Sequence, residues 1–339
     1  MNLLLVRPDG IGDEILCLPV ASALRRVMPQ ARISFLSSDH AAPVLAHHPD
    51  LDEVLTVTGR ERFGDLVALF RRGFEAVVFL KPFRRLMLAA WAARVPMRVA
   101  TGYRWYSLLA NRRVYEHRSD FSKHESEYNL GLLTGLGLSP GQAKSPVLVL
   151  TEEERRWAQQ ALSGLPQPRV VVHPGGLSTR RWRVEYYRAL VQQLAKEGVG
   201  VVLTGSQAEG EYFRNATAKV PIEKTRVLDV MGLVSLRQLM AVIGASHAVV
   251  SGSTGPAHIA AGLAVPTVSL FDPRRNQLPT RWQPLGKGLV LRPDVPTCPR
   301  CIGEACPYWD CLDRITVGEV ALRVKQVVDR AEDLAVLHV

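Results

Sequence analysis

The stretch Ala248–Phe271, AVVSGSTGPAHIAAGLAVPTVSLF, joins two apolar runs through a loop of small residues. Residues 248–250 have the pattern of a buried strand, and a helix opens on Pro256 after the loop Ser251–Gly255. Proline suits the first helical turn, where its missing N–H costs nothing. Small residues before it leave the backbone amides at the helix start open to a phosphate. The stretch therefore predicts a strand–loop–helix–strand unit that could bind phosphate, although an ordinary loop capped by Ser253 would have the same pattern.

The length and composition indicate a soluble two-domain protein. The chain has 339 residues, of which 47% are hydrophobic and 22% charged, as in ordinary globular proteins. It has no run of the roughly 20 apolar residues that a membrane-spanning helix needs. The start, MNLLLVRPDG, lacks the features of a signal peptide. We therefore expect a cytoplasmic protein.

Basic residues are concentrated in the first half of the chain. The net charge is +10, and the segment between Lys81 and Arg118 contributes +8, since Glu116 is its one acidic residue. Its basic residues are Lys81, Arg84, Arg85, Arg94, Arg98, Arg104, Arg112, Arg113 and Arg118. Such a field attracts nucleic acid, an acidic membrane surface or a phosphorylated substrate, although solvated arginines on helix faces would look the same. We disfavour nucleic acid because no nucleic-acid-binding motif accompanies the charge.

Strand and helix patterns alternate through both halves of the chain. Apolar runs such as 3–6, 76–80, 170–173 and 199–204 predict buried strands, and helical periodicities separate them. Repeated β-α-β alternation predicts parallel sheets with helices on both faces, an α/β fold. We expect a Rossmann-like domain over residues 1–146 and a second over 147–315. A helix within 316–339 would pack back on the first domain. Two such domains would leave a cleft at the carboxyl ends of their strands.

The segment Arg7-Pro8-Asp9-Gly10-Ile11-Gly12-Asp13 joins the first strand to the first helix. A carboxylate at Asp13 would be stabilised by the helix dipole and could serve as a base beside the cleft. Aspartate is also a favoured N-cap, so a purely structural role explains the position equally well. A dinucleotide-binding GxGxxG fingerprint is absent here.

Two further loops follow strands in the second half. Gly175 and Gly176 precede Arg180 and Arg181, an arrangement that can hold a diphosphate through backbone amides and charge, or that can be a turn followed by surface arginines. Ser206 and Glu209 have the spacing of a capping box. The carboxylate of Glu209 could instead accept hydrogen bonds from ribose hydroxyls, and the spacing does not separate these two roles.

Four cysteines lie close together near the C-terminus, at Cys298, Cys301, Cys306 and Cys311. Four thiols in so short a segment, including a CxxC pair, could hold a structural zinc or iron. The alternative is a set of reduced thiols. We predict one structural metal ion, remote from any reaction.

Together these motifs resemble glycosyltransferase family nine, whose best-known members are the ADP-heptose:lipopolysaccharide heptosyltransferases. The resemblance spans nearly the whole chain. It is carried by Gly12-Asp13, by Pro174-Gly175-Gly176 with Arg180-Arg181-Trp182, by Gly205 with Glu209, by Ser253-Thr254-Gly255-Pro256-Ala257-His258, and by the cysteine segment. It implies a GT-B fold, with two Rossmann-like domains facing each other across a cleft.

The resemblance also implies roles for individual residues. Asp13 matches the general base, Glu209 a nucleotide-contacting residue and Val234 a residue beside the adenine. The diphosphate and pyrophosphate loops match Gly175, Gly176, Arg180, Ser253, Thr254, Gly255 and His258. This chain has Ser253 where the family usually has Asp, and Arg180 where it usually has Lys. The first departure affects the expected sugar specificity more than nucleotide binding.

We therefore expect an inverting glycosyltransferase that moves a sugar, heptose by the resemblance, from an ADP-sugar to a lipopolysaccharide-core-type or other phosphorylated glycan. Arg84, Arg85 and Arg104 would bind the acceptor at the inner face of the membrane, which implies transient membrane contact. No metal is needed for this chemistry if the arginines and helix amides stabilise the leaving group. The alternatives are a non-catalytic nucleotide-sugar-binding protein and a GT-B-fold nucleotide-sugar epimerase.

Overall fold

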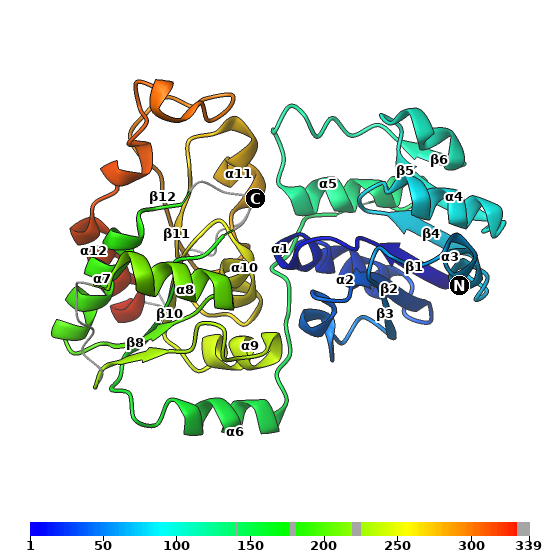
Figure 1. The fold of residues 1–339 in the computed structure, drawn as a ribbon. Helices are drawn as coiled ribbons and strands as arrows, with labels where there is room; N and C mark the ends of the chain where they lie inside the picture. Colours follow the sequence, from blue (N-terminus) through cyan, green and yellow to red (C-terminus); the bar gives the residue numbers. More distant parts are fainter. Residues whose placement is uncertain (140, 177–180, 219–224, 331–339) are drawn as a thin grey trace. The chain divides into compact units, whose positions relative to one another are not determined.

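The structure is a computed structural model that describes residues 1–139, 141–176, 181–218 and 225–330. The chain divides into two compact units, Met1–Val149 and Leu150–Val339, which can be followed by colour in Figure 1. Each unit contains its own parallel sheet of six strands in the described residues. The predicted α/β class is confirmed.

The first unit is a doubly wound sheet with the strand order β3-β2-β1-β4-β5-β6. Its strands are β1 (Asn2–Val6), β2 (Arg32–Ser38), β3 (Glu53–Val57), β4 (Ala76–Phe79), β5 (Met97–Thr101) and β6 (Arg112–Val114). Its helices are α1 (Ile11–Ile15), α2 (Leu18–Val27), α3 (Phe63–Phe70), α4 (Arg84–Ala92) and α5 (Glu125–Gly131), with the 3-10 turns η1 (Ala42–Leu45), η2 (Trp105–Leu109) and η3 (Leu132–Leu136).

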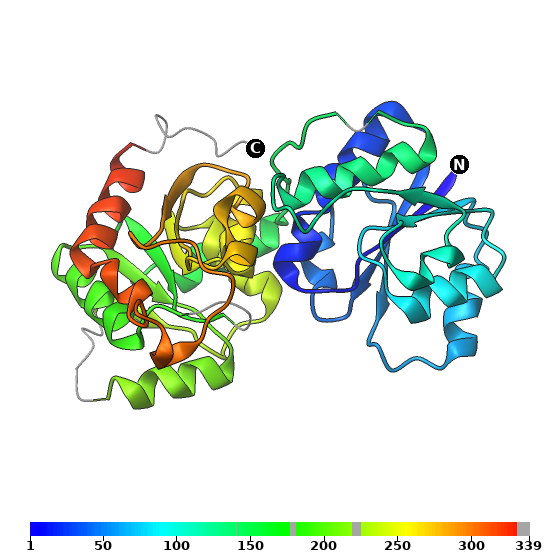
Figure 2. The same cartoon turned by 90° about the horizontal axis from the view of Figure 1, so that it is seen from above.

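Helices cover both faces of this first sheet. Helices α2 and α5 contact each other, as do α3 and α4, and Figure 2 shows the two pairs on opposite sides of the strands. The central strand β1 is consequently buried on both faces, with Leu3 and Leu4 completely inaccessible to solvent. This explains its unbroken apolar sequence, which is typical of parallel sheets.

The second unit repeats the arrangement, with the strand order β12-β11-β10-β7-β8-β9. Its strands are β7 (Arg169–His173), β8 (Gly200–Leu203), β9 (Val227–Asp229), β10 (Ala248–Gly252), β11 (Thr267–Leu270) and β12 (Gly288–Leu291). Its helices are α6 (Glu152–Ala161), α7 (Val184–Lys196), α8 (Gln207–Ala216), α9 (Leu236–Gly244), α10 (Gly255–Gly262), α11 (Pro279–Trp282) and α12 (Val317–Asp329), with the 3-10 turns η4 (Arg275–Gln277), η5 (Gly303–Ala305) and η6 (Cys311–Arg314).

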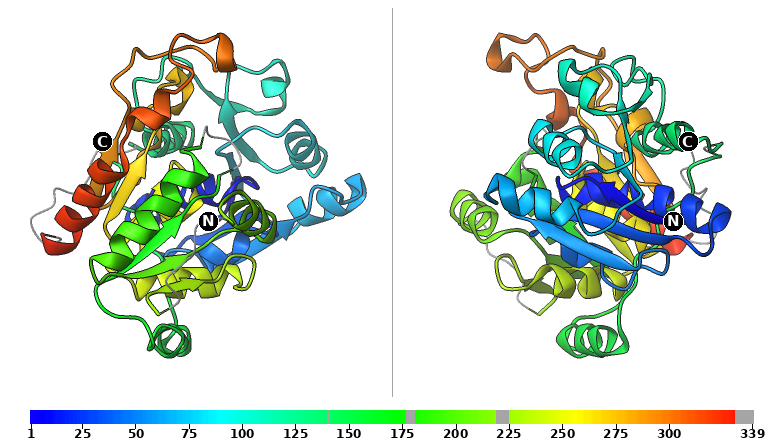
Figure 3. Two further views of the ribbon diagram at one scale, coloured as in Figure 1. Left: turned by 60° about the vertical axis from the view of Figure 1, so that its left-hand side comes forward. Right: turned by 90° about the vertical axis from the view of Figure 1, so that its right-hand side faces the viewer.

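The last described helix, α12, belongs to the second unit. It packs on α7 and on strands β10, β11 and β12, and Figure 3 shows it alongside α7. Packing of a helix within 316–339 on the first domain stays a prediction; the main contacts of residues 317–329 are with the second sheet and α7. Val320 and Val324 are buried there, because a sheet face left open by the other helices needs an apolar cover.

Three strands were not predicted from the sequence: β5, β6 and β12. Strand β6 has only three residues, two of them exposed arginines, at the edge of its sheet. An edge strand of this kind has no apolar run that distinguishes it from a loop. In the same region, helix α5 ends at Gly131 and a 3-10 turn follows.

Candidate functional site

In the first unit, the order of strand addition reverses between β1 and β4. Ligands of doubly wound sheets bind at such a switch point, beyond the carboxyl ends of the strands. The loop after β1 starts at Arg7, and the segment after β4 contains Lys81. An ion pair joins these two segments, because the Nζ atom of Lys81 lies 2.5 Å from Oδ2 of Asp9. The Arg7–Asp13 segment therefore lies where this fold binds ligands.

Asp13 lies within helix α1 and does not cap it. The N-cap is Gly10, which has no side chain, and Asp13 is the third residue of the helix. Its Oδ1 atom accepts a hydrogen bond from Nη2 of Arg7, and its side chain remains 30% exposed. The N-cap explanation of this aspartate is thus wrong. The carboxylate is held by a guanidinium and is still open to solvent on one side.

Arg7 is itself fixed by a buried ion pair from another part of the unit. Its Nη1 atom donates to Oε1 of Glu125 over 2.7 Å, and both side chains are almost fully buried. Arg118 donates to the same oxygen over 2.6 Å. Glu125 begins helix α5, which is capped by His124. A buried carboxylate between two guanidinium groups anchors Arg7, and Arg7 in turn orients Asp13.

The environment of Asp13 suits a base. Burial raises the pKa of Asp13 above the ordinary aspartate value, and the charge of Arg7 acts in the opposite direction. A raised pKa makes the carboxylate a stronger base, while Arg7 favours its ionised form. The partial exposure of the side chain leaves the carboxylate accessible to a hydroxyl group.

The two neighbouring acids have other partners. Glu14 is completely buried. Its carboxylate accepts hydrogen bonds from Ser37 Oγ at 2.5 Å and from the Ser38 backbone N–H at 2.9 Å. Burial raises the pKa of Glu14 to about 7 despite these bonds. Asp9 is paired with Lys81 and also lies 3.6 Å from Nε of Arg7. Of the three acids, Asp13 has the most exposed side chain.

A cavity of about 480 Å³ opens beside this loop in the first unit. Its walls include Asp9, Gly10, His40 and Arg85. The guanidinium of Arg85 also donates to the carbonyl of Glu61. The structure thus brings Arg85, one of the predicted acceptor residues, next to the segment that carries Asp13.

The other two predicted acceptor arginines lie elsewhere on the first unit. The guanidinium of Arg84 lies over the ring of Trp105, 6.0 Å from its centroid. Arg104 is the N-cap residue of η2. Neither is among the residues that line the cavity.

In the second unit the switch point lies between β7 and β10, and the predicted donor residues follow the ends of β7, β8, β9 and β10. The loop after β7 contains Gly175 and Gly176. The backbone N–H of Gly176 donates to Oε1 of Glu209 over 2.9 Å. The other oxygen of Glu209 accepts from the Ser206 N–H, also over 2.9 Å. Glu209 therefore ties the loops after β7 and β8 together.

These hydrogen bonds show that Glu209 does belong to a capping box. The hydroxyl of Ser206 accepts a hydrogen bond from the Glu209 N–H, and the carboxylate of Glu209 bonds back to Ser206. Burial raises the pKa of Glu209, but the backbone hydrogen bonds from Ser206 and Gly176 outweigh that effect and hold it below the usual value. The carboxylate is thus charged, and its side chain is 14% exposed.

Glycine at position 175 leaves room for this carboxylate. A Cβ atom on Gly175 would lie 2.5 Å from Oε1 of Glu209, well inside contact distance. Gly176 has a φ of +144°, a conformation that other residues rarely adopt. The glycine pair therefore allows the loop to approach Glu209 closely. Arg181 completes this corner by donating from Nε to the carbonyl of Gly176 over 2.6 Å. Arg180 lies outside the described residues.

The loop after β10 leads into α10 as the sequence predicted. Thr254 is the N-cap, Gly255 is the first helical residue, and no side chain caps the helix. Ser253 and Thr254 are half-buried, whereas His258, one turn further on, is buried. The half-exposed start of the helix is accessible to a phosphate, and it lies at the switch point.

Val234 lies in the loop after β9, just before Ser235, the N-cap of α9. Gly232 in this loop donates its N–H to the carbonyl of Gly205 over 2.9 Å. A Cβ atom on Gly232 would approach Cα of Gln207 to 2.7 Å. The loop with Val234 is therefore packed against the loop that carries Ser206 and Glu209, and Val234 itself is half-buried.

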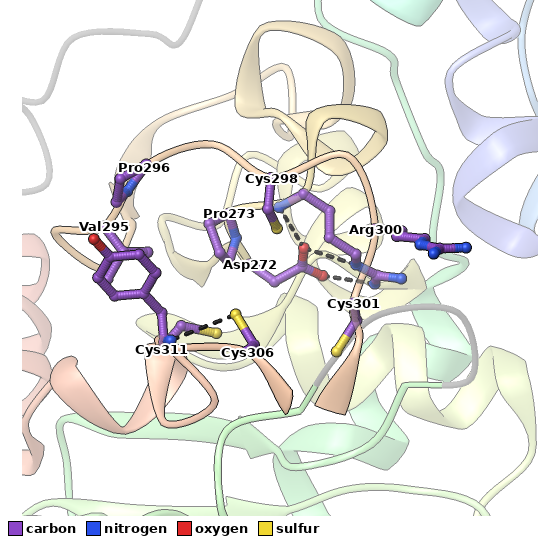
Figure 4. Close-up of a pocket in the computed structure, with 11 residues that line it drawn as sticks. Asp272, Pro273, Val295, Pro296, Cys298, Arg300, Cys301, Cys306 and Cys311 are labelled. Carbon is purple, nitrogen blue, oxygen red and sulfur yellow. Dashed lines mark hydrogen bonds and ion pairs between the residues drawn. The ribbon is translucent and has the colours of Figure 1, made fainter. Parts of the chain in front are cut away.

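The four clustered cysteines line one small cavity of about 30 Å³, together with Asp272 and Arg274 (Figure 4). Cys311 is buried, Cys298 and Cys306 are half-buried, and Cys301 is exposed. Within the described residues, no three His, Cys, Asp or Glu side chains are arranged to hold a metal ion. The thiols are thus neighbours without forming a coordination shell, and the metal prediction is not confirmed.

Two doubly wound parallel sheets define a protein of the two-domain Rossmann-like type, and comparisons with known proteins identify the family. Residues 68–298 match glycosyltransferase family 9 (heptosyltransferase). The chain belongs to this family and is a glycosyltransferase. Within the described part of the chain, no helix has both the length and the apolar character needed to cross a membrane.

Individual relatives agree with this assignment. Lipopolysaccharide heptosyltransferase 2 of Escherichia coli K12 is 26% identical over 294 residues, which cover 80% of this chain and 83% of that protein. Lipopolysaccharide heptosyltransferase 1 of Pseudomonas aeruginosa is 25% identical, with 91% and 88% covered. The solved structure of E. coli ADP-heptose lps heptosyltransferase II superimposes with a TM-score of 0.82 at 23% identity, covering 98% of this chain and all of that one. The GT-B fold is thereby confirmed.

Sequence reasoning missed the residues that support Asp13. Arg7 and Glu125 are 118 positions apart, and no local pattern links them. One sequence feature did indicate such a partner. Arg7 directly follows the apolar strand β1, and an arginine at the end of a buried strand needs an acidic partner.

Proposed function

We propose that this protein is an inverting heptosyltransferase. It would transfer heptose from an ADP-heptose-type donor to an anionic glycan of the lipopolysaccharide-core type. The observation that carries the proposal is the half-exposed carboxylate of Asp13, held by the buried Arg7 at the switch point of the first sheet. The names of the relatives support heptose as the sugar and ADP as the carrier.

In the proposed reaction, Asp13 takes the proton of an acceptor hydroxyl as that oxygen attacks the anomeric carbon of the sugar. The new glycosidic bond forms on the face opposite the diphosphate, and the bond from the anomeric carbon to the phosphate oxygen breaks. The proton ends on Asp13 and the electron pair on ADP. Burial supports this role because it raises the pKa of Asp13 and so its basicity.

The second unit would bind the donor. Amides at the start of α10, around Thr254 and Gly255, would hold the diphosphate and stabilise the charge that develops on it. Gly175, Gly176 and Arg180 would contribute from the loop after β7. His258 and Ser253 flank the same helix start. This arrangement is supported by the position of both loops at the switch point between β7 and β10.

The nucleoside would lie over the loops after β8 and β9. Glu209 would accept hydrogen bonds from the ribose hydroxyls with the lone pairs that remain on its charged carboxylate. Val234 would pack against the adenine. The packing of the two loops against each other, through Gly232 and Gln207, supports a shared binding surface.

The acceptor would bind in the cavity beside Asp9 and Gly10. Its volume of about 480 Å³ suits one or two sugar rings. Arg85 in its wall would pair with an acceptor phosphate, and Arg84 and Arg104 would attract the anionic glycan over a longer range.

The experiment is to mix purified protein with ADP-heptose and with a phosphorylated core glycan, and to measure release of ADP with and without the glycan. We expect ADP release that requires the glycan, together with a glycan heavier by one heptose. Nucleotide-sugar binding without any turnover would favour a binding protein, and conversion of the donor without a glycan would favour an epimerase. Substituting ADP-glucose for ADP-heptose tests the sugar, where Ser253 departs from the family pattern.

A further inference from the structure

Large apolar side chains are exposed on two adjoining elements of the first unit. On α4, Leu88 is 40% and Trp91 53% exposed, and on η2, Trp105 is 73% and Leu108 64% exposed. Isolated exposed apolar residues are common on proteins. A group that includes two tryptophans on neighbouring elements is uncommon and marks a binding surface.

The geometry of the two elements places these side chains on common faces. Arg84, Leu88 and Trp91 follow one another at spacings of four and three residues, so they share one side of α4. The opposite side is buried through Leu86, Met87, Ala89 and Ala90. In the 3-10 turn η2, Trp105 and Leu108 are three residues apart and therefore lie one above the other.

Two contacts bring the faces together. The guanidinium of Arg84 lies over the ring of Trp105, with 6.0 Å between Cζ and the ring centroid. The hydroxyl of Tyr106 donates to the carbonyl of Pro82 over 3.0 Å, at the start of α4. Helix α4 and turn η2 are in contact. The apolar groups of both elements thus belong to one surface.

Arginines accompany these apolar side chains, and the segment that carries them has no acid. Arg84, Arg94 and Arg104 are exposed, and residues 82–115 contain neither Asp nor Glu. We call the combined group the tryptophan–arginine surface; its members are Arg84, Leu88, Trp91, Arg94, Arg104, Trp105 and Leu108. Tryptophan favours the headgroup level of a bilayer, and arginine pairs with lipid phosphates.

We propose that the tryptophan–arginine surface docks the protein on a bilayer that contains anionic phospholipids. The tryptophans and leucines enter the boundary between headgroups and acyl chains, and the arginines contact lipid phosphates. Charge complementarity favours this occupant over a second copy of the chain, because two copies would bring arginines against arginines. The proposal does not depend on the reaction proposed above.

The test is co-sedimentation of the purified chain with vesicles of phosphatidylcholine alone or with one quarter phosphatidylglycerol. We expect binding to the anionic vesicles, weak binding to the neutral ones, and loss of binding at high salt. Replacing the two exposed apolar side chains of η2 (Trp105→Gln with Leu108→Gln) should weaken partitioning of the protein onto the vesicles at least tenfold. Arg94→Gln should weaken it about fivefold.

The matched control is Leu322→Gln. Leu322 is 62% exposed, similar to Leu108, but lies on α12 in the second unit, so this variant should bind like the wild type. Thermal unfolding of every variant separates lost docking from lost folding. Failure of the wild type to bind anionic vesicles, or wild-type binding by the Trp105/Leu108 double variant, overturns the proposal. A dimer that the double variant abolishes, without any vesicle binding, assigns the surface to a second copy and overturns it as well.

Discussion

At the scale of single residues, the molecule assigns different roles to acids that look equivalent in the sequence. Asp9, Asp13 and Glu14 lie within six residues of one another, at the start of the first helix. Glu14 is buried under hydrogen bonds from Ser37 and Ser38, and Asp9 is paired with Lys81. The sequence could identify the loop as a candidate site, but it could not rank these acids by contacts, because their partners come from distant segments.

The pH dependence of the reaction should reflect the environment of Asp13. Because burial raises its pKa, kcat/KM should fall as the pH drops through a value above the ordinary aspartate pKa of about 3.9. Arg7 opposes this shift, so Arg7→Gln should move the acid limb to higher pH. The measurement is a pH–rate profile of both proteins.

Arg118→Gln is the control for that experiment. Arg118 bonds to Glu125 and Asn129, so its removal also weakens the buried pair but spares the direct contact with Asp13. Its acid limb should stay near that of the wild type. An unchanged limb in Arg7→Gln, in a folded protein, would contradict the assignment of this pKa to Asp13.

Gly175 offers a second test at the residue scale. Gly175→Ala would place a methyl group 2.5 Å from Oε1 of Glu209 and so separate the loops after β7 and β8. We expect a loss of about 1–3 kcal/mol in stability and weaker ADP binding, measured by thermal unfolding and calorimetry. Gly164→Ala is the matched control, since its added Cβ has nothing within 4 Å. Equal ADP affinity in the two variants would show that this loop does not touch the nucleotide.

At the scale of elements, the sequence patterns gave correct predictions where an element depends only on contacts between residues close in sequence. The capping box at Ser206 is formed as its spacing indicated, and the loop after β10 opens a helix with Pro256 in its first turn. The N-cap interpretation of Asp13 was wrong because a residue's capping preference does not show at which residue a helix begins. The edge strand β6 was not predicted because its extended conformation depends on pairing with β5.

The cysteine segment carries a prediction at this scale. Four thiols that line one cavity predict one zinc or iron ion per chain, and binding would require the side chains to turn towards one another. Elemental analysis of protein purified without added metal measures the content, and an alkylation assay measures the thiol reactivity. Four rapidly alkylated thiols in a metal-free protein would contradict the prediction.

At the scale of the whole molecule, two similar sheets carry two different sites. Both have their switch point between their first and fourth strands. The first unit places the carboxylate of Asp13 and a cavity there, and the second places glycine loops and an open helix start. The repeated β-α alternation was enough to predict the two sheets. The prediction that one unit binds the donor and the other the acceptor depended on family resemblance, because sheet topology alone does not specify chemistry.

The assignment of the donor site to the second unit predicts which loops ADP protects. ADP should slow hydrogen exchange in the loops after β7, β8, β9 and β10, and it should protect the Asp13 loop much less. At a concentration 100 times its Kd, ADP should stabilise the folded protein by about 2.7 kcal/mol. Protection centred on the first unit would contradict the assignment of the donor site.

The central claim is that Asp13 is the base of the transfer reaction, and Asp13→Asn tests it most directly. Asparagine keeps the size of the side chain and can still accept a hydrogen bond from Arg7, but it cannot take a proton. Asp65→Asn is the matched control, because Asp65 lies on α3, pairs with Arg62 and is not among the residues that line the cavity. We predict that Asp13→Asn melts near the wild-type temperature, binds ADP normally and transfers sugar about 10²–10⁴-fold more slowly, while Asp65→Asn retains most of the activity. Transfer by Asp13→Asn within a few-fold of the wild-type rate would contradict the account.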